Sequence, residues 1–152
     1  MKKLFSVGMA GVLSLGINMA AYADGDMSEE AIEYRAAAME MIVWNFKPMG
    51  AMVSGKIPFD AQAFAKRAAN VAVLSSMPLE GFIPGTDEGD TDAKAKIWEN
   101  WEDFKAKMVK FEEKSGKLAE VAKTATSVKE VMRPFLNTAK TCKGCHRKYK
   151  EK

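Results

Sequence analysis

The 152-residue chain contains little cysteine and histidine, with two cysteines and one histidine in total. So few cysteines exclude a disulfide-stabilised scaffold, and three residues of these types fall short of the four ligands of a structural zinc site. Only five prolines and eleven glycines occur, which excludes collagen-like and low-complexity chains. With 47% hydrophobic and 28% charged residues, the sequence predicts one globular domain.

Long apolar runs are also lacking. Leu4 to Ala20 carries no charge, but it is shorter than a membrane-spanning helix and is interrupted by glycine, serine and asparagine. Two lysines precede this stretch and Ala21-Tyr22-Ala23 follows it, a pattern typical of a cleaved secretory signal peptide. We therefore predict a signal peptide over residues 1–23, a mature domain over 24–152, no membrane span and a periplasmic location.

The predicted cleavage also removes most of the basic charge. The whole chain has 23 Lys and Arg against 20 Asp and Glu, a net charge of +3. Lys2 and Lys3 leave with residues 1–23 and no acid does, so 21 basic residues remain against 20 acids, a net charge of +1. A nearly neutral chain gives no reason to expect a nucleic-acid partner.

Apolar residues recur at helical spacing in the first half of the mature chain. A first helix is expected after the N-cap Ser28 and ends near Ser54, with Pro48 as a possible kink. Its inward face contains one arginine among apolar residues: Ile32, Arg35, Met39, Ile42, Phe46, Met49 and Val53. A second helix is expected from the N-cap Asp60 to Met77, where Pro78 stops it. Residues 78–91 are then expected to form the one long loop.

The second half predicts two further helices. One is expected from a cap at Asp92 to Ala122, and the other starts at the capping-box pattern Ser127-x-x-Glu130 and continues toward the C-terminus. No stretch of useful length alternates as a β-strand does. Four helices with mostly short connections predict an all-α fold, an antiparallel (up-down) four-helix bundle.

The motif Cys142-Lys143-Gly144-Cys145-His146 uses both cysteines and the only histidine of the chain. On a helix these three side chains lie on one side, so both thiols can bond to the vinyl groups of a haem while the imidazole reaches the iron. A disulfide closing so short a loop would stabilise little, and a thioredoxin-like pair needs a βαβ setting. We therefore predict one covalent haem c, attached through Cys142 and Cys145, with His146 as an iron ligand.

Only six residues follow His146, so a second protein ligand to the iron comes from an earlier helix or is absent. Methionine is the remaining candidate, although most methionines serve as flexible core fillers. Eight remain after residue 23: Met27, Met39, Met41, Met49, Met52, Met77, Met108 and Met132. Met39 stands out because it follows Arg35 by one turn on the inward face. A guanidinium there needs an anion, which a haem propionate supplies, unless it reaches solvent or a nearby glutamate.

Over essentially the whole mature chain, the sequence resembles the cytochrome c′ family. The matching segments are Tyr34-Arg35 with an apolar residue at 39, Phe82-x-Pro84-Gly85-Thr86 followed by Gly89-Asp90, Ile97-Trp98, and Cys142 to His146 followed by Tyr149. The resemblance implies that Arg35 binds a propionate and that Asp90 lies near the haem edge. It implies that three side chains crowd the distal face: Met39, Leu79 and Phe82. It also implies a five-coordinate, high-spin iron with His146 as its only protein ligand, in a homodimer built on the first two helices.

The sequence departs from the family pattern at two positions. Ala36 stands where many members have a glutamine, and Lys150 stands where many have an arginine near the proximal face, so a charge persists there without the bidentate fork. The related cytochromes c-556 share the fold but use a first-helix methionine as sixth ligand, so an electron-transfer protein with a low-spin iron bound by Met39 remains the alternative.

An apolar distal pocket has no hydrogen-bond donor for O₂ and no acid or base for peroxide cleavage, so we expect no enzyme activity and no catalytic residue. The expected ligands are NO and CO, and the expected role is NO sequestration or resistance, or redox use. No feature of the sequence identifies a redox partner protein.

Overall fold

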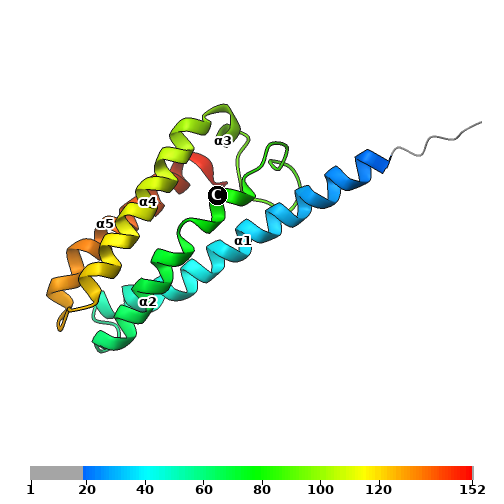
Figure 1. Ribbon diagram of the computed structural model, residues 1–152. Coiled ribbons are helices and arrows are strands. Elements are labelled where there is room, and N and C mark those ends of the chain that lie inside the picture. Colours follow the sequence, from blue (N-terminus) through cyan, green and yellow to red (C-terminus); the bar gives the residue numbers. More distant parts are fainter. Residues whose placement is uncertain (1–18, 152) are drawn as a thin grey trace, which may run out of the picture.

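Four long helices form a bundle in the computed structural model, which describes the backbone of residues 19–151 and the side chains of residues 27–151. They are α1 (Met19–Val53), α2 (Ala61–Leu74), α4 (Trp101–Ala122) and α5 (Val128–Tyr149). The helices run alternately up and down, and both α1 and α4 pack against α2 and α5 (Figure 1). The predicted antiparallel four-helix bundle is confirmed. Within residues 19–151, no helix has both the length and the apolar character needed to cross a bilayer.

The first helix starts earlier than the sequence predicted. It begins at Met19, so Ser28 lies inside α1 and is not its N-cap. The residues just before Ser28 include several alanines, which have the highest helix propensity and allow the helix to extend upstream. Pro48 lies inside α1 without ending it, and the helix ends at Val53, as expected. Residues 1–18 of the predicted signal peptide lie outside the described part of the chain.

The second helix begins as predicted and ends earlier. The Asp60 carboxylate accepts the Ala63 N–H at 2.9 Å, which caps α2. The helix ends at Leu74, not at Met77, and a 3₁₀ helix, η1 (Met77–Gly81), follows. Pro78 therefore lies in the first turn of η1, where its missing N–H has no cost, and the segment predicted to be an irregular loop starts with ordered structure.

The predicted third helix is two helices, and Asp92 does not cap it. α3 (Lys96–Glu99) is a single turn, and Asn100, with φ −128° and ψ 42°, separates it from α4. The Asp92 carboxylate is instead paired with Lys150, and the backbone carbonyl of Asp92 accepts the Glu151 N–H at 2.8 Å. Contacts between segments almost sixty residues apart thus replace the local cap that the sequence pattern favoured.

The last helix begins at the predicted position. Ser127 precedes α5, and the Glu130 carboxylate accepts the Ser127 hydroxyl at 2.6 Å and the Thr126 N–H at 3.2 Å. These hydrogen bonds, the Ser127 hydroxyl first, lower the pKa of Glu130. At its other end α5 is tied to the long loop, since the Lys94 N–H donates to the Tyr149 carbonyl at 3.1 Å. Among the described residues, Ala93 and Lys150 form an isolated β-bridge.

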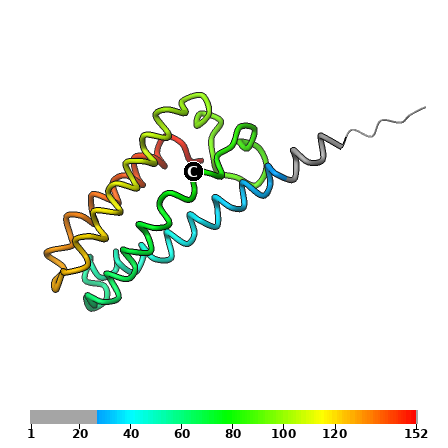
Figure 2. The backbone as a smooth tube through the Cα atoms, in the orientation of Figure 1, coloured from blue at the N-terminus to red at the C-terminus, as the bar shows by residue number. Residues whose placement is uncertain are grey.

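The interior consists of two apolar clusters. The large core cluster joins all four long helices and includes Met49, Phe64, Leu118 and Phe135. Phe135 of α5 stacks on Phe46 of α1 with ring centroids 4.5 Å apart. The small core cluster consists of Ile97, Phe104, Met108 and Tyr149. It lies at the end of the bundle where α5 meets the long loop, close to the C-terminus that Figure 2 marks.

Gly81 allows η1 to approach α1 closely. A Cβ atom at this position would lie 2.6 Å from the Ala31 carbonyl oxygen and 2.8 Å from the Arg35 Cβ. Both contacts are far below van der Waals distance, so we expect Gly81→Ala to lower the free energy of unfolding by about 1–3 kcal/mol, measured by guanidinium denaturation of the holoprotein. Gly116→Ala is the matched control, because nothing lies within 4 Å of its Cβ position in α4, and it should stabilise the protein by about 0.5–1 kcal/mol. Equal effects of the two substitutions would contradict this account.

Candidate haem-binding site

The two cysteines and the histidine lie in the last two turns of α5. Both thiols are free and half-buried, and they are in contact with different parts of the interior: Cys142 with the large core cluster and Cys145 with the small one. His146 follows on the adjacent side of the helix and is exposed. The motif therefore presents its two thiols to the interior at the border between the two clusters.

Burial controls the protonation of these side chains. It raises the pKa of the Cys142 thiol, and it raises that of Cys145 to about 11. Partial shielding from water, followed by the charge of Lys150, lowers the pKa of the exposed His146 side chain. At neutral pH the thiols are thus protonated and the imidazole is neutral, with a nitrogen lone pair available to a metal.

These residues fit a covalent haem. Two free thiols at i and i+3 with an imidazole at i+4 are the donor set that a c-type haem requires, and one helix holds all three. The thiols border a cluster rich in aromatic side chains, which suits a large flat apolar ring. In the bound protein Cys142 and Cys145 would form the thioether bonds and His146 would bind the iron.

The structure brings three of the predicted distal residues together. Met39 of α1, Leu79 of η1 and Phe82 just after η1 are all half-buried, and all pack against the small core cluster that Cys145 contacts. The Phe82 ring meets the Phe104 ring edge to face, with centroids 4.7 Å apart. Met39 also contacts the large core cluster, so its thioether lies at the same border as the two thiols.

Arg35 is almost fully buried, with 3% of its surface exposed, and its guanidinium holds the long loop. One terminal nitrogen donates to the Gly81 carbonyl at 2.9 Å and to the Thr86 hydroxyl at 2.5 Å. The other donates to the Thr86 carbonyl at 2.6 Å and to the Thr91 hydroxyl at 2.9 Å. The group also lies over the Phe82 ring, 4.6 Å from its centroid. The predicted inward position of Arg35 is confirmed, and its hydrogen-bond partners are uncharged groups of the long loop.

Burial lowers the pKa of the Arg35 guanidinium, and the charge of Asp87 partly offsets this. The group remains charged, since an arginine does not lose its proton in proteins. Asp90, the last of the predicted site residues, is exposed and has no hydrogen bond or ion pair within the described part of the chain. The structure does not bring Asp90 into the group formed by Met39, Leu79 and Phe82. The contacts of Arg35 and Asp90 with a haem remain predictions.

Sequence reasoning missed a residue that fixes the end of α5. The Asp103 carboxylate of α4 accepts the Tyr149 hydroxyl at 2.5 Å and the Lys148 ammonium at 2.8 Å, and Lys107 lies 3.3 Å away. Tyr149 is buried, and its ring packs edge to face on Phe104. Asp103 therefore fixes the turn that follows His146. In the sequence it is one acid among the charges of a solvent-exposed helix face, and no local pattern distinguishes it.

The hydrogen bonds of Asp103 predict a specific dependence of stability on pH. The Lys148 and Tyr149 bonds, in that order, lower the pKa of Asp103 well below the ordinary carboxyl value. A depressed folded-state pKa stabilises the fold above the unfolded value of about 3.9, and this contribution is lost as the pH falls below it. We expect Asp103→Asn to lower stability at pH 7, and the difference from the wild type to shrink toward pH 2, measured by urea denaturation across this range. A difference that stays constant with pH would contradict the role of the charge.

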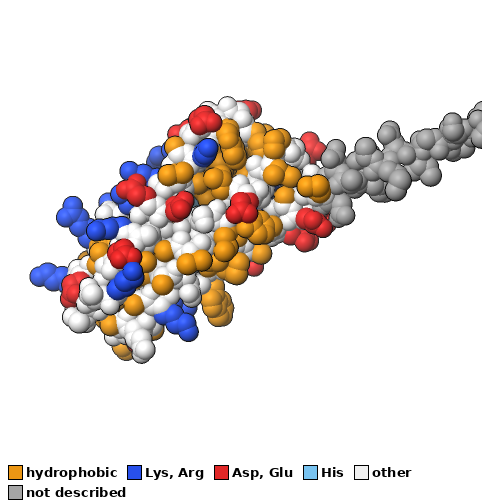
Figure 3. Space-filling model, in the orientation of Figure 1, with side chains coloured by type: hydrophobic (Ala, Val, Ile, Leu, Met, Phe, Trp, Pro, Cys, Tyr) orange, Lys and Arg blue, Asp and Glu red, His pale blue; other side chains and the backbone are white. Residues whose placement is uncertain are grey.

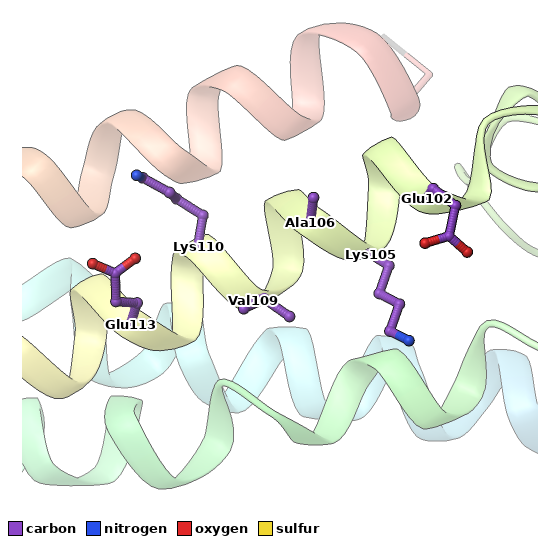
Figure 4. Close-up of a pocket in the computed structure, with 6 residues that line it drawn as sticks. All are labelled: Glu102, Lys105, Ala106, Val109, Lys110 and Glu113. Carbon is purple, nitrogen blue, oxygen red and sulfur yellow. The ribbon is translucent and has the colours of Figure 1, made fainter.

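A separate hollow lies on α4. It measures about 350 Å³, and α4 alone lines it (Figure 4): Glu102, Lys105, Ala106, Val109, Lys110 and Glu113. None of these residues belongs to either core cluster or to the Cys142–His146 motif. The hollow is a feature of the helix surface and is not the haem site.

The fold and this donor set define a four-helix-bundle protein that holds a c-type haem near its C-terminus. Comparison with known proteins identifies the family. The family described as cytochrome c′ matches residues 30–150. Cytochrome c′ of Halomonas halodenitrificans is 39% identical over 123 residues, which cover 78% of this chain and 93% of that protein. The chain belongs to the cytochrome c′ family and carries one covalent c-type haem.

Solved structures agree with this assignment. The structure of cytochrome c prime from Shewanella frigidimarina is 50% identical, with a TM-score of 0.80, and the match covers 82% of this chain and 97% of the other. A ferrous variant of cytochrome c prime from Alcaligenes xylosoxidans with bound NO is 32% identical, with a TM-score of 0.75 and coverage of 82% and 96%. The bundle and the haem predicted from the sequence are confirmed.

Proposed function

We propose that this protein is a periplasmic haem protein that binds NO and CO, with His146 as the only protein ligand to a five-coordinate, high-spin iron. The observation that carries the proposal is the gathering of Met39, Leu79 and Phe82 against the cluster that Cys145 contacts. When bound, the haem supplies an iron that takes up a small diatomic ligand or exchanges one electron. The relative with bound NO supports NO as the ligand class.

The polarity of these side chains favours NO and CO over O₂ or peroxide. A thioether, an isobutyl group and a phenyl ring offer no hydrogen-bond donor and no group that can take up or release a proton. Arg35 is a buried charged residue of α1, and its terminal N–H groups are donated to the loop acceptors Gly81, Thr86 and Thr91. Such residues exclude water and admit a small neutral ligand. This arrangement supports NO sequestration or resistance, without catalytic turnover, as the proposed role.

Anaerobic titration of the purified ferrous protein with NO and with CO tests the proposal. We expect a high-spin optical spectrum before addition and saturable binding of both gases. Stable O₂ binding or peroxidase turnover would overturn it, because both require a distal donor.

An electron-transfer protein with Met39 as sixth iron ligand is the second candidate. The observation that favours it is the position of Met39, half-buried on α1 and in contact with both core clusters that the two cysteines border. A thioether at this border can serve either as an apolar cover or as a ligand, and the resting spectrum separates these roles.

Met39→Ala distinguishes the two candidates. For a five-coordinate iron, the resting ferric and ferrous spectra should remain high-spin in both the wild type and the variant, because no iron–sulfur bond is lost. Faster CO binding is expected in the variant, by about tenfold or more, as the smaller side chain opens the distal side. Met108→Ala, a methionine of the small core cluster, serves as the control for a general loss of packing. A low-spin wild-type spectrum that becomes high-spin in Met39→Ala would establish the second candidate instead.

The periplasmic location follows from the predicted signal peptide over residues 1–23. N-terminal sequencing of the protein recovered from a bacterial periplasmic fraction tests it. The expected mature chain begins at Asp24 and has a mass that includes one haem. A chain that retains Met1 and stays in the cytoplasm would contradict this part of the proposal.

We also propose a homodimer built on α1 and α2. Their outer surfaces expose large apolar side chains that no described element covers: Met41, Val43 and Trp44 on α1 and Val73 on α2. Trp44 is 77% exposed, and a tryptophan that leaves water on association dominates the energy of many interfaces. Sedimentation of the holoprotein should show a dimer that Trp44→Glu converts to a monomer, with the haem spectrum unchanged.

A further inference from the structure

The charge of the chain is strongly polarised along the sequence. Residues 27–92 contain ten acids and five Lys and Arg, a net charge of −5, whereas residues 93–152 contain eight acids and sixteen Lys and Arg, a net charge of +8. Figure 3 shows most blue side chains on the side of α4 and α5, with some acids among them, and further acids at the end where α1 enters the described structure. The net charge of the whole chain is therefore small, although one side of the molecule is basic.

The outer face of α5 concentrates this charge. Five exposed cations occur along the helix with a spacing of three, four or seven residues: Lys129, Arg133, Lys140, Lys143 and Arg147. At 100° per residue they fall within an arc of about 80°, and they extend over about 27 Å of helix. We refer to them as the α5 cationic stripe. Cys142 and Cys145 point to the opposite side of the same helix, so the stripe lies behind the haem attachment.

The charges of the stripe are not compensated within the described structure. Ion pairs are formed by other lysines, such as Lys148 with Asp103 and Lys150 with Asp92, and none involves a member of the stripe. Glu130 is the one acid in α5, and it is engaged by Ser127 and Thr126 at the start of the helix. A row of five like charges on one helix face is unfavourable for folding, and it becomes favourable when an anionic surface faces it.

We propose that the outer face of α5 is a docking surface for an acidic protein. Near its middle the stripe contains an exposed leucine, Leu136, which is 47% exposed, and Met132 beside it is 40% exposed. Apolar side chains at the centre with charges around them are the usual composition of a protein interface, whereas an anionic lipid surface needs only the charges. Both aromatic residues of α5, Phe135 and Tyr149, are buried, so none is free to stack on nucleic-acid bases. The inference does not depend on whether Met39 binds the iron.

The experiment compares two triple variants of the holoprotein with the same loss of three charges. Lys129, Arg133 and Lys140 are changed to Gln in the first, which leaves untouched Lys143 within the haem motif and Arg147 directly after it. Lys105, Lys110 and Lys117, exposed lysines of α4 without ion pairs, are changed to Gln in the second. Calorimetry at low ionic strength measures the affinity of each for flavodoxin, a small acidic protein used as the probe. Unchanged haem spectra and unfolding midpoints verify that both variants are folded.

We expect flavodoxin to bind the wild type, the α5 variant to bind about tenfold more weakly, and the α4 variant to bind within about twofold of the wild type. Absence of binding at low salt, or equal weakening by both variants, would overturn the proposal. So would tighter binding to vesicles of equal parts phosphatidylglycerol and phosphatidylcholine than to flavodoxin, which would assign the stripe to a lipid surface. Self-association at low salt that the α5 variant abolishes would assign it to the acidic end of a second copy.

Discussion

Replacing both Cys142 and Cys145 by alanine should abolish covalent haem in the purified protein. Thioether bonds to the two vinyl groups need the two thiols, and the chain has no other cysteine that could substitute. Extraction with acidified acetone should then remove all haem from the double variant and none from the wild type. Either single variant should keep one bond and shift the pyridine haemochrome band toward that of a haem with one free vinyl group. Mass spectrometry of the denatured chain provides the direct measurement.

Thr141→Ala is the control for this prediction. Thr141 precedes Cys142 and donates its hydroxyl to the Thr138 carbonyl at 2.7 Å, so its loss perturbs the same turn of α5 without removing a thiol. The covalent haem content should stay at the wild-type level. Covalent haem that persists in the double cysteine variant would contradict the assignment of the site, and loss of haem in Thr141→Ala would show that the conformation of the turn, not the thiols, limits attachment.

The periodic parts of the fold could be predicted from the sequence, because each depends on neighbours within one or two turns. The cap at Asp60, the start of α5 after Ser127 and the helix ends at Val53 and Ala122 are of this kind. The sequence predictions are wrong where contacts with distant segments determine the local structure. Asp92 has the residue type and position of a cap, but Lys150 and the Glu151 N–H, which come from the other end of the chain, engage it instead.

The residues of the candidate site also fall into two groups, those that the local sequence predicts and those that it does not. The Cys142–His146 motif is local in sequence, and Arg35 and Met39 could be found because an arginine on an apolar helix face is unusual. The partners of Arg35 could not be predicted, since Thr86 and Thr91 are ordinary loop residues whose importance comes only from their position beside α1. The helical spacing indicated that the buried charge of Arg35 needed a partner. In the structure, uncharged oxygen atoms of the long loop accept its hydrogen bonds.

Arg35→Met should cause a large loss of stability, because the guanidinium is almost fully buried and hydrogen-bonded to the long loop. The variant keeps most of the side-chain volume but leaves the Gly81 and Thr86 carbonyls without their donors inside the protein. Unsatisfied buried acceptors cost about 1–3 kcal/mol each, so we expect the free energy of unfolding to fall by about 3 kcal/mol in guanidinium denaturation of the holoprotein. Arg35→Lys should lose less, because an ammonium group keeps the charge and can satisfy some of the acceptors, but not with the planar fork.

A double-mutant cycle with Thr91→Val measures how much one loop contact of Arg35 contributes to stability. Thr91 accepts one guanidinium N–H at 2.9 Å and also receives the Ala93 N–H at 3.1 Å, so it connects Arg35 to the segment that pairs with the end of α5. If Arg35 mainly organises the loop, Thr91→Val should lower stability by about 1 kcal/mol in the wild type and by clearly less in Arg35→Met. Additive effects of the two substitutions would show that the Arg35–Thr91 hydrogen bond contributes little, and that the stability Arg35 provides comes from its other partners.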